Sequence, residues 1–168
     1  NIQNTANYAR GYAPKGQTPV VKVEAQKLKI EMLSAISKRG KLRFMLYKDS
    51  MNTEKLIDFM TRLITDSKKK VFLILDNLRV HHAKKVMAWL EEHKDRIELF
   101  YLPPYAPEYN PDEYLNNDLK RNLGTQAMVK DVHELESNTT DFMTQLSGDP
   151  DHVKAYFDHP VLQPYKLD

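Results

Sequence analysis

The sequence contains no cysteine and no long apolar run. Without cysteine among its 168 residues, the chain has neither a disulfide framework nor a thiolate metal site, which fits a reducing cytosol. No segment approaches the roughly 20 consecutive apolar residues of a membrane-spanning helix, and the first residues lack the apolar core of a signal peptide. We therefore expect a soluble protein that works in the cytoplasm and has no membrane partner.

An excess of one charge is also missing. Lys and Arg number 25 against 23 Asp and Glu, and the net charge of +2 is too small to identify a nucleic-acid partner. Any DNA-binding surface must therefore be local. With 168 residues and 41% hydrophobic content, the chain suits one compact domain over 1–168 that buries most of its unfolded surface.

The first half of the chain predicts strands followed by a helix. Two apolar runs with partial alternation, 27–36 and 41–47, flank the Gly-containing stretch "SKRG" and predict a β-hairpin, preceded by a short apolar run at 20–23. From Asn52 onward the apolar residues recur with helical spacing. This pattern predicts an amphipathic helix over 52–67 with Asn52 or Thr53 near its cap.

A strand, a helix and a second strand follow. "VFLILD", residues 71–76, is a nearly continuous apolar run that ends on an acid, which is typical of a strand buried on both faces. A helix over 83–93 and a strand over 97–102 then imply parallel pairing through a right-handed crossover. The predicted fold class is α/β, a mixed sheet flanked by helices, with the remaining helices at 111–123 ending at Gly124, 131–146 and 151–157 stopped before Pro160.

Asp76 stands at the carboxyl end of the predicted 71–76 strand. In α/β sheets, ligands gather at such strand ends, so Asp76 is a candidate ligand-binding carboxylate. The alternative is that Asp76 caps or turns the loop "DNLRVHH", because Asp commonly bonds nearby backbone groups.

A proline-rich stretch leads to a second acid. "LPPYAPEYNP", residues 102–111 and here called the proline strap, restricts the backbone before the helix that carries Glu113. Asn110 is a good N-cap and Glu113 follows three residues later, so "NPDE" also reads as a capping box. Capping does not explain the prolines, which fix where the helix begins and where Glu113 points. Asp76 and Glu113 would suit Mg²⁺, which binds one or two carboxylates together with water and phosphate, and paired carboxylates hold the ions in two-metal phosphoryl transfer.

These two acids lie in motifs that resemble a known family. "LILDNLRVHHAKKV" and "LFYLPPYAPEYNPDEYLNNDLKR" are similar to the second and third acidic motifs of the DDE transposases, specifically the bacterial insertion-sequence group related to mariner elements. Thirty-six residues separate Asp76 from Glu113, close to the mid-thirties interval of that family. Earlier segments, "RGYAPKGQTPVV" and "LSAISKRGKLRFMLY", extend the likeness over about residues 8–125. The resemblance implies an RNase H-like fold, DNA strand cleavage and strand transfer with Mg²⁺ or Mn²⁺, and a bacterial cytoplasmic setting.

The resemblance also implies roles for individual residues. Asp76 becomes the second catalytic acid and Glu113 the third, both as metal ligands. Asn77 and His81 match the family's companions of the second acid and would order the loop or approach phosphate; the alternative is an ordinary loop or cap role. Asn110 supports the start of the helix. Residual contacts with DNA phosphates are expected from four basic residues, namely Lys84, Lys85, Lys120 and Arg121. The alternative is that these side chains only solvate the exposed faces of their helices.

The chain departs from the family at its beginning. The family's first catalytic Asp lies on the first strand, shortly before a segment like "NTANYARGYAPKG", whereas this chain begins at Asn1 and has no acid until Glu24. Asp49 reads as a turn residue and Asp112 as a solvated first-turn acid. Loss of a central strand would leave its neighbours without ladder partners, unless residues 1–15, a second copy or a longer chain supply one. We therefore expect weak metal binding and low strand cutting.

The resemblance implies DNA, both transposon ends and target, as the partner, and a homodimer as the assembly. The family's helix-turn-helix region is absent from this sequence, so sequence-specific binding is not expected. Two alternatives stay open: another RNase H-like nuclease, against which the proline strap argues, and a non-catalytic remnant that binds DNA or oligomerises. Four tyrosines would either stack on bases or pack beside the prolines, namely Tyr101, Tyr105, Tyr109 and Tyr114.

Overall fold

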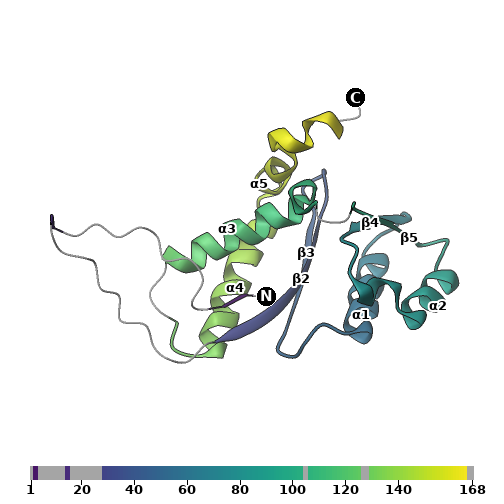
Figure 1. Cartoon of the computed structure of the whole chain (residues 1–168), viewed down its shortest axis with the longest axis horizontal. Coiled ribbons are helices and arrows are strands. Elements are labelled where there is room, and N and C mark those ends of the chain that lie inside the picture. The colour runs from purple at the N-terminus through teal and green to yellow at the C-terminus, as the bar shows by residue number, and fades with distance from the viewer. Residues whose placement is uncertain (1, 4–13, 16–27, 104–105, 126–128, 166–168) are drawn as a thin grey trace. The chain divides into compact units, whose positions relative to one another are not determined.

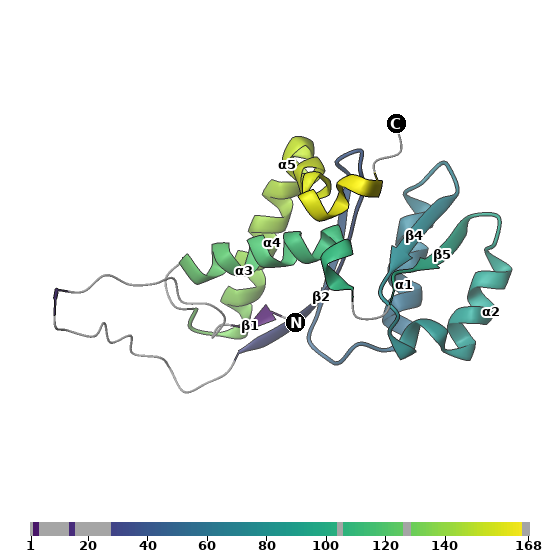
Figure 2. The same ribbon diagram turned by 45° about the horizontal axis from the view of Figure 1, so that its top comes forward.

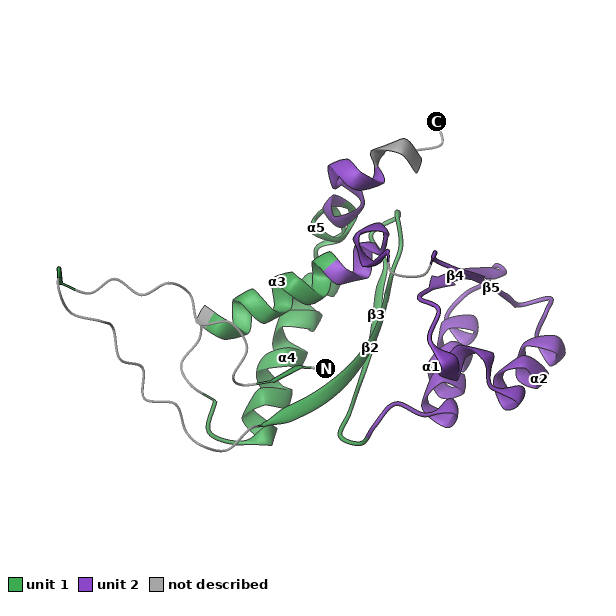
Figure 3. Cartoon of the chain, in the orientation of Figure 1, with its two compact units in different colours: residues 1–49, 114–154 green, residues 50–113, 155–168 purple. Residues whose placement is uncertain are grey.

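The computed structural model describes residues 2–3, 14–15, 28–103, 106–125 and 129–165 (Figure 1, Figure 2). The chain forms two compact units (Figure 3). Unit 1 comprises Asn1–Asp49 and Tyr114–Lys154, and unit 2 comprises Ser50–Glu113 and Ala155–Asp168. Among the described residues, no helix combines the length and the apolar character needed to cross a membrane.

Unit 1 contains an antiparallel sheet of three strands. The strands are β1 (Ile2–Gln3), β2 (Lys29–Ile36) and β3 (Leu42–Tyr47), in the order β1-β2-β3. The β2-β3 hairpin, paired from Ile36↔Leu42 to Glu31↔Tyr47, confirms the predicted hairpin. The apolar run at 20–23 lies outside the described residues.

Helices complete unit 1. They are α3 (Pro111–Thr125), whose first residues belong to unit 2, α4 (Val132–Ser147) and α5 (Pro150–Ala155). The helix α4 lies against β2 and β3, and its N-cap is Asp131, whose side chain accepts from the Glu134 N–H at 2.8 Å. The helix α3 continues through Gly124, where the sequence predicted its end. Its side chains buried at helical spacing are Leu115, Leu119 and Leu123.

Unit 2 contains a parallel pair of strands over two helices. Its elements are α1 (Thr53–Thr65), β4 (Val71–Leu75), the 3₁₀ turn η1 (Arg79–His82), α2 (Lys84–Glu92) and β5 (Ile97–Tyr101). The parallel β4-β5 pairing confirms the predicted strand-helix-strand unit. The core between strands and helices consists of Leu56, Met60, Ile64, Val86 and Ile97.

The expectation that β4 is buried on both faces was wrong for the described structure. Phe72 and Ile74 are 63% and 62% exposed, and Phe100 on the neighbouring β5 is 45% exposed. The intervening residues Val71 and Leu73 pack on the α1 and α2 core instead. The helices of unit 2 therefore cover one face of this pair of strands.

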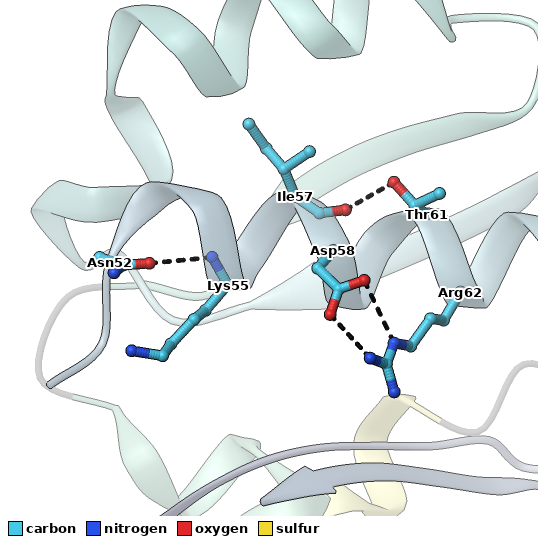
Figure 4. Close-up of polar contacts among 6 residues, drawn as sticks. All are labelled: Asn52, Lys55, Ile57, Asp58, Thr61 and Arg62. Carbon is cyan, nitrogen blue, oxygen red and sulfur yellow. Dashed lines mark hydrogen bonds and ion pairs between the residues drawn. The ribbon is translucent and has the colours of Figure 1, made fainter. Parts of the chain in front are cut away.

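The start of α1 is fixed as the sequence predicted (Figure 4). Asn52 is the N-cap, and its Oδ1 accepts from the Lys55 N–H at 2.9 Å. One turn further, the Arg62 guanidinium donates two hydrogen bonds to the Asp58 carboxylate, at 2.9 and 3.2 Å. Such an exposed pair at i,i+4 adds only a few tenths of a kcal/mol, so the cap and the buried face set the helix.

The predicted mixed sheet appears as its two components. Antiparallel and parallel strand pairs are both present, and within the described residues no ladder joins β4 to the three-stranded sheet. Ile2 and Gln3 pair with Ile30 and Lys29 of β2. These two residues supply β2 with a partner, but among the described residues β4 pairs with β5 alone, so the expected closure of the gap by residues 1–15 is not seen there.

The chain ends in short helical turns. The predicted 151–157 helix appears as α5 followed by the 3₁₀ turn η3 (Tyr156–Asp158), and a further turn, η4 (Pro160–Tyr165), begins at Pro160. Within unit 2, η4 lies against η2 (Pro107–Tyr109), the 3₁₀ turn of the proline strap. The C-terminal turn η4 therefore packs on the proline strap.

Replacing Gly40 by Ala tests the hairpin turn. Gly40 has φ of 78°, and a Cβ there would lie 2.8 Å from Cα of Pro150 and against its carbonyl oxygen. We expect the Gly40→Ala variant to lose about 1–3 kcal/mol of unfolding free energy, because both the backbone angle and the space require glycine. Urea unfolding measures this loss. Gly148→Ala is the matched control, because Gly148 has φ of −84° and more room; equal losses in both variants would contradict the argument.

Candidate active site

The parallel pairing of β4 and β5 places Asp76 and the proline strap at one edge. Both strands end at the same side, because Leu75 pairs with Tyr101. The Leu102 N–H then donates to the Leu75 carbonyl at 2.9 Å, so the strap leaves the sheet beside the residue that precedes Asp76. Two segments far apart in the sequence are thus held together by backbone hydrogen bonds.

The Asp76 side chain does not serve the loop as a cap. It is 55% exposed, and the turn η1 has Leu78 at its N-cap position with no side-chain hydrogen bond. Its described contact is with His81, whose Nδ1 lies 2.7 Å from the Asp76 carbonyl oxygen and 3.4 Å from Oδ1. The loop-capping alternative for Asp76 therefore has no support in this geometry.

A second group of polar side chains surrounds the same loop. The Asn77 Oδ1 is hydrogen-bonded to Nε2 of His82, and the His82 ring lies against Tyr101 with centroids 4.6 Å apart. Burial raises the pKa of the Tyr101 hydroxyl. His82 was not predicted from the sequence, although it lies next to His81 and its partner Tyr101 ends a predicted strand. Tyr101 thus packs on a histidine and not on the prolines that the packing alternative named.

Asn110 caps α3, but the capping box is not formed. The Asn110 Oδ1 accepts from the Asp112 N–H at 3.1 Å, and its carbonyl accepts from the Glu113 N–H at 3.0 Å. The Asn110 N–H, which Glu113 would have to bond, donates instead to the Pro107 carbonyl at 2.9 Å. The Asn110 N–H is thus already bonded within the 3₁₀ turn of the strap. The exposed Glu113 carboxylate has no hydrogen-bond or ion-pair partner within the described residues.

The other three tyrosines of this region are Tyr105, Tyr109 and Tyr114. Tyr109 and Tyr114 are partly buried, which fits packing. Tyr105 lies outside the described residues.

The four basic residues predicted to meet phosphates differ in their surroundings. Lys85 pairs with Glu54 at 2.8 Å, and this hydrogen bond raises the pKa of Lys85 and lowers that of Glu54. Lys84 is exposed and has no partner among the described residues. On α3 in unit 1, Lys120 is partly buried and Arg121 is exposed. Lys84 and Lys85 belong to unit 2. Of these four residues, Lys84 is therefore the most available cation in unit 2.

The donor set of unit 2 fits a hard divalent cation. Asp76 and Glu113 both belong to this unit and present exposed carboxylates, the oxygen ligands that Mg²⁺ and Mn²⁺ prefer. Within the described part of the chain, no group of three or more His, Asp or Glu side chains is arranged around a common metal position. The candidate metal ligands of unit 2 are thus these two carboxylates, each held by its own element.

Two solved structures share the fold of this chain. In the pre-cleavage Mos1 transpososome, the similarity covers 99% of this chain and 54% of the other, with 15% identity and a TM-score of 0.67. In the catalytic domain of Mos1 mariner transposase, it covers 89% of this chain and 79% of the other, with 15% identity and a TM-score of 0.61. This chain spans about half the length of the first. The predicted RNase H-like α/β fold is confirmed.

The motifs lie within a family match of most of the chain. No curated protein matches the sequence. Residues 1–136, which include Asp76, Glu113 and the whole proline strap, match the family model described as DDE superfamily endonuclease. The predicted family is thereby confirmed, and the chain belongs to the DDE superfamily endonucleases.

Proposed function

We propose that this chain is the catalytic domain of a DDE transposase that cuts and transfers DNA strands, with Mg²⁺ or Mn²⁺ bound by Asp76 and Glu113. The observation that carries this proposal is that both carboxylates are exposed and neither serves its own helix or loop as a cap. Two exposed acids that cap no helix or turn, on firmly held elements of one unit, are suited to bind a shared ligand.

The two acids reach the site from different supports. Asp76 follows the last rung of β4, where the strand pairing fixes its backbone. Glu113 stands in the first turn of α3, where Asn110 and the strap fix the beginning of the helix. When bound, the metal supplies charge stabilisation and an activated oxygen for phosphoryl transfer. The protein's contribution is to hold the carboxylates so that little reorganisation is needed.

DNA is the partner that the proposal requires. One similar solved structure is a pre-cleavage transpososome, and this chain carries the exposed Lys84 at the first position of α2, next to the Asp76 loop. We extend the proposal to transposon ends and target as substrates, to a homodimer as the assembly and to the bacterial cytoplasm as the location. The expectation that strand cutting by these 168 residues is low stays a prediction.

A non-catalytic role remains the second candidate. It is favoured by one observation, namely that the described residues contain no metal group of three or more His, Asp or Glu side chains. Such a module would bind DNA through Lys84 and its neighbours without binding metal. The metal-binding experiment below separates the two functions.

Neutral substitutions of the acids test the metal site. We expect Asp76→Asn and Glu113→Gln each to weaken Mn²⁺ binding at least about tenfold, because each removes one charged oxygen ligand. Electron paramagnetic resonance of free Mn²⁺ measures the affinity and needs no catalysis.

Two exposed acids at the opposite end of the strand pair serve as controls. Asp95→Asn and Glu92→Gln remove the same charges near the beginning of β5 and should leave Mn²⁺ affinity within about twofold. If all four variants bind Mn²⁺ alike, the metal site is wrong and the non-catalytic role gains support.

Lysine substitutions test the DNA surface. We expect Lys84→Ala to weaken binding to a duplex of arbitrary sequence and to reduce the slope of log affinity against log salt by about 0.9. Glu54→Gln should tighten binding, because it releases Lys85 from its ion pair. Fluorescence anisotropy at several salt concentrations measures both effects. Lys94→Ala, which removes a lysine paired with Glu91, is the control; an unchanged slope in Lys84→Ala would remove Lys84 from the DNA surface.

A further inference from the structure

The backbone carbonyl of Asp76 is the first one beyond the β4-β5 ladder. The Leu75 carbonyl accepts from the Leu102 N–H and completes the ladder. The next carbonyl, that of Asp76, lies past the end of the strand and needs another donor. His81 supplies it, since its Nδ1 is 2.7 Å from the Asp76 oxygen.

The His81 ring is held by the fold. His81 is only 5% exposed, and its turn η1 lies against both α1 and α2. Its own N–H donates to the Leu78 carbonyl at 3.0 Å, which closes the 3₁₀ turn. The Tyr101 hydroxyl lies 3.5 Å from the His81 carbonyl. The position of the ring therefore follows from packing and backbone bonds.

The contact decides which ring nitrogen carries the proton. A carbonyl oxygen only accepts hydrogen bonds, so Nδ1 must be the donor. In the neutral ring, Nε2 is then without a proton. The same Nδ1–H lies 3.4 Å from Oδ1 of Asp76, so it faces both the backbone and the carboxylate of one residue.

We propose that His81 is a positioning residue for the Asp76 carboxylate, through its Nδ1–H on the Asp76 carbonyl and beside Oδ1. This inference rests on the proposed metal-binding function of Asp76. By fixing the Asp76 peptide, the ring fixes the direction of the Cα–Cβ bond and leaves the carboxylate 55% exposed to a cation. In this role His81 orients Asp76, the proposed metal ligand, and does not itself bind a phosphate. Partners that orient a metal ligand in this way contribute strongly to metal affinity.

The neighbouring His82 provides a natural comparison. Its ring is exposed, bonds Asn77 and packs on Tyr101, with no contact to Asp76 among the described interactions. Two adjacent histidines therefore differ in burial and in partner. Only His81 should influence the metal site.

The first test reads the tautomer of His81 in the full chain. Long-range ¹H–¹⁵N spectra at about pH 8.5, where free imidazole is neutral, distinguish an Nδ1–H ring from an Nε2–H ring. We expect Nδ1–H for His81, both in the wild type and in Asp76→Asn, which keeps the backbone carbonyl. An Nε2–H ring in the wild type would overturn the proposal without any metal measurement.

The second test compares Mn²⁺ affinity among matched variants. His81→Phe keeps the ring volume and removes the donor, and we expect about tenfold weaker binding. His81→Asn places an amide N–H near the position of Nδ1 and should stay within about threefold of the wild type. His82→Phe keeps the packing on Tyr101 and should also stay within about threefold. Wild-type affinity in His81→Phe, or equal losses in His81→Asn and His81→Phe, would overturn the positioning role.

Two further comparisons keep the result decisive. If thermal unfolding shows that His81→Phe does not fold, His81→Gln replaces it, because the Gln amide matches the position of Nε2 and not that of Nδ1. Equal Mn²⁺ affinity of His81→Asn and His81→Gln would then overturn the proposal. Loss of binding in Asp76→Asn but not in the donor-less His81 variants would overturn the role of His81 alone. Unchanged binding in Asp76→Asn would instead overturn the proposed function, and the role of His81 with it.

Discussion

The parallel register of β4 and β5 is the constraint on which the candidate site depends. Rungs from Val71↔Ile97 to Leu75↔Tyr101, extended by the Leu102 N–H on the Leu75 carbonyl, bring two strand ends to one edge. In a parallel pair, the segments that follow the strands leave from the same side, so the Asp76 loop and the proline strap begin next to each other. The core formed with α1 and α2 fixes the pair from one face. The position of Asp76 is therefore set by backbone pairing.

Hydrogen-bond satisfaction explains why both acids are available. Loop and helix-start N–H and C=O groups need partners, and Asp or Glu side chains commonly supply them. Here other groups do so: His81 bonds the Asp76 carbonyl, the Asn110 side chain caps α3, and the Pro107 carbonyl takes the Asn110 N–H. The strap's 3₁₀ turn thus performs the task that Glu113 would have in a capping box. Rigidity and availability of the carboxylate have the same structural origin.

Features encoded in local sequence were predictable, and those set by tertiary contacts were not. The β2-β3 hairpin, the Asn52 cap and the strand-helix-strand unit follow from periodicity and turn chemistry within short windows. The exposed Phe72 was missed because a continuous apolar run contains no polar residue to mark its open face. The capping box failed because the Pro107 carbonyl competes for the same N–H, and the His82–Tyr101 packing depends on contact between distant segments.

The geometry of η1 explains why the adjacent His81 and His82 have different partners. In a 3₁₀ turn, successive side chains are rotated by about 120°, so neighbours face different surroundings. His81 faces inward, where η1 lies against α1 and α2, and meets the Asp76 carbonyl; His82 faces outward to Asn77 and Tyr101. His82 is only one residue further along, yet its ring bonds Asn77 and makes no contact with the Asp76 carbonyl among the described interactions. The five-residue spacing from Asp76 to His81 therefore matters more than the presence of histidine in the loop.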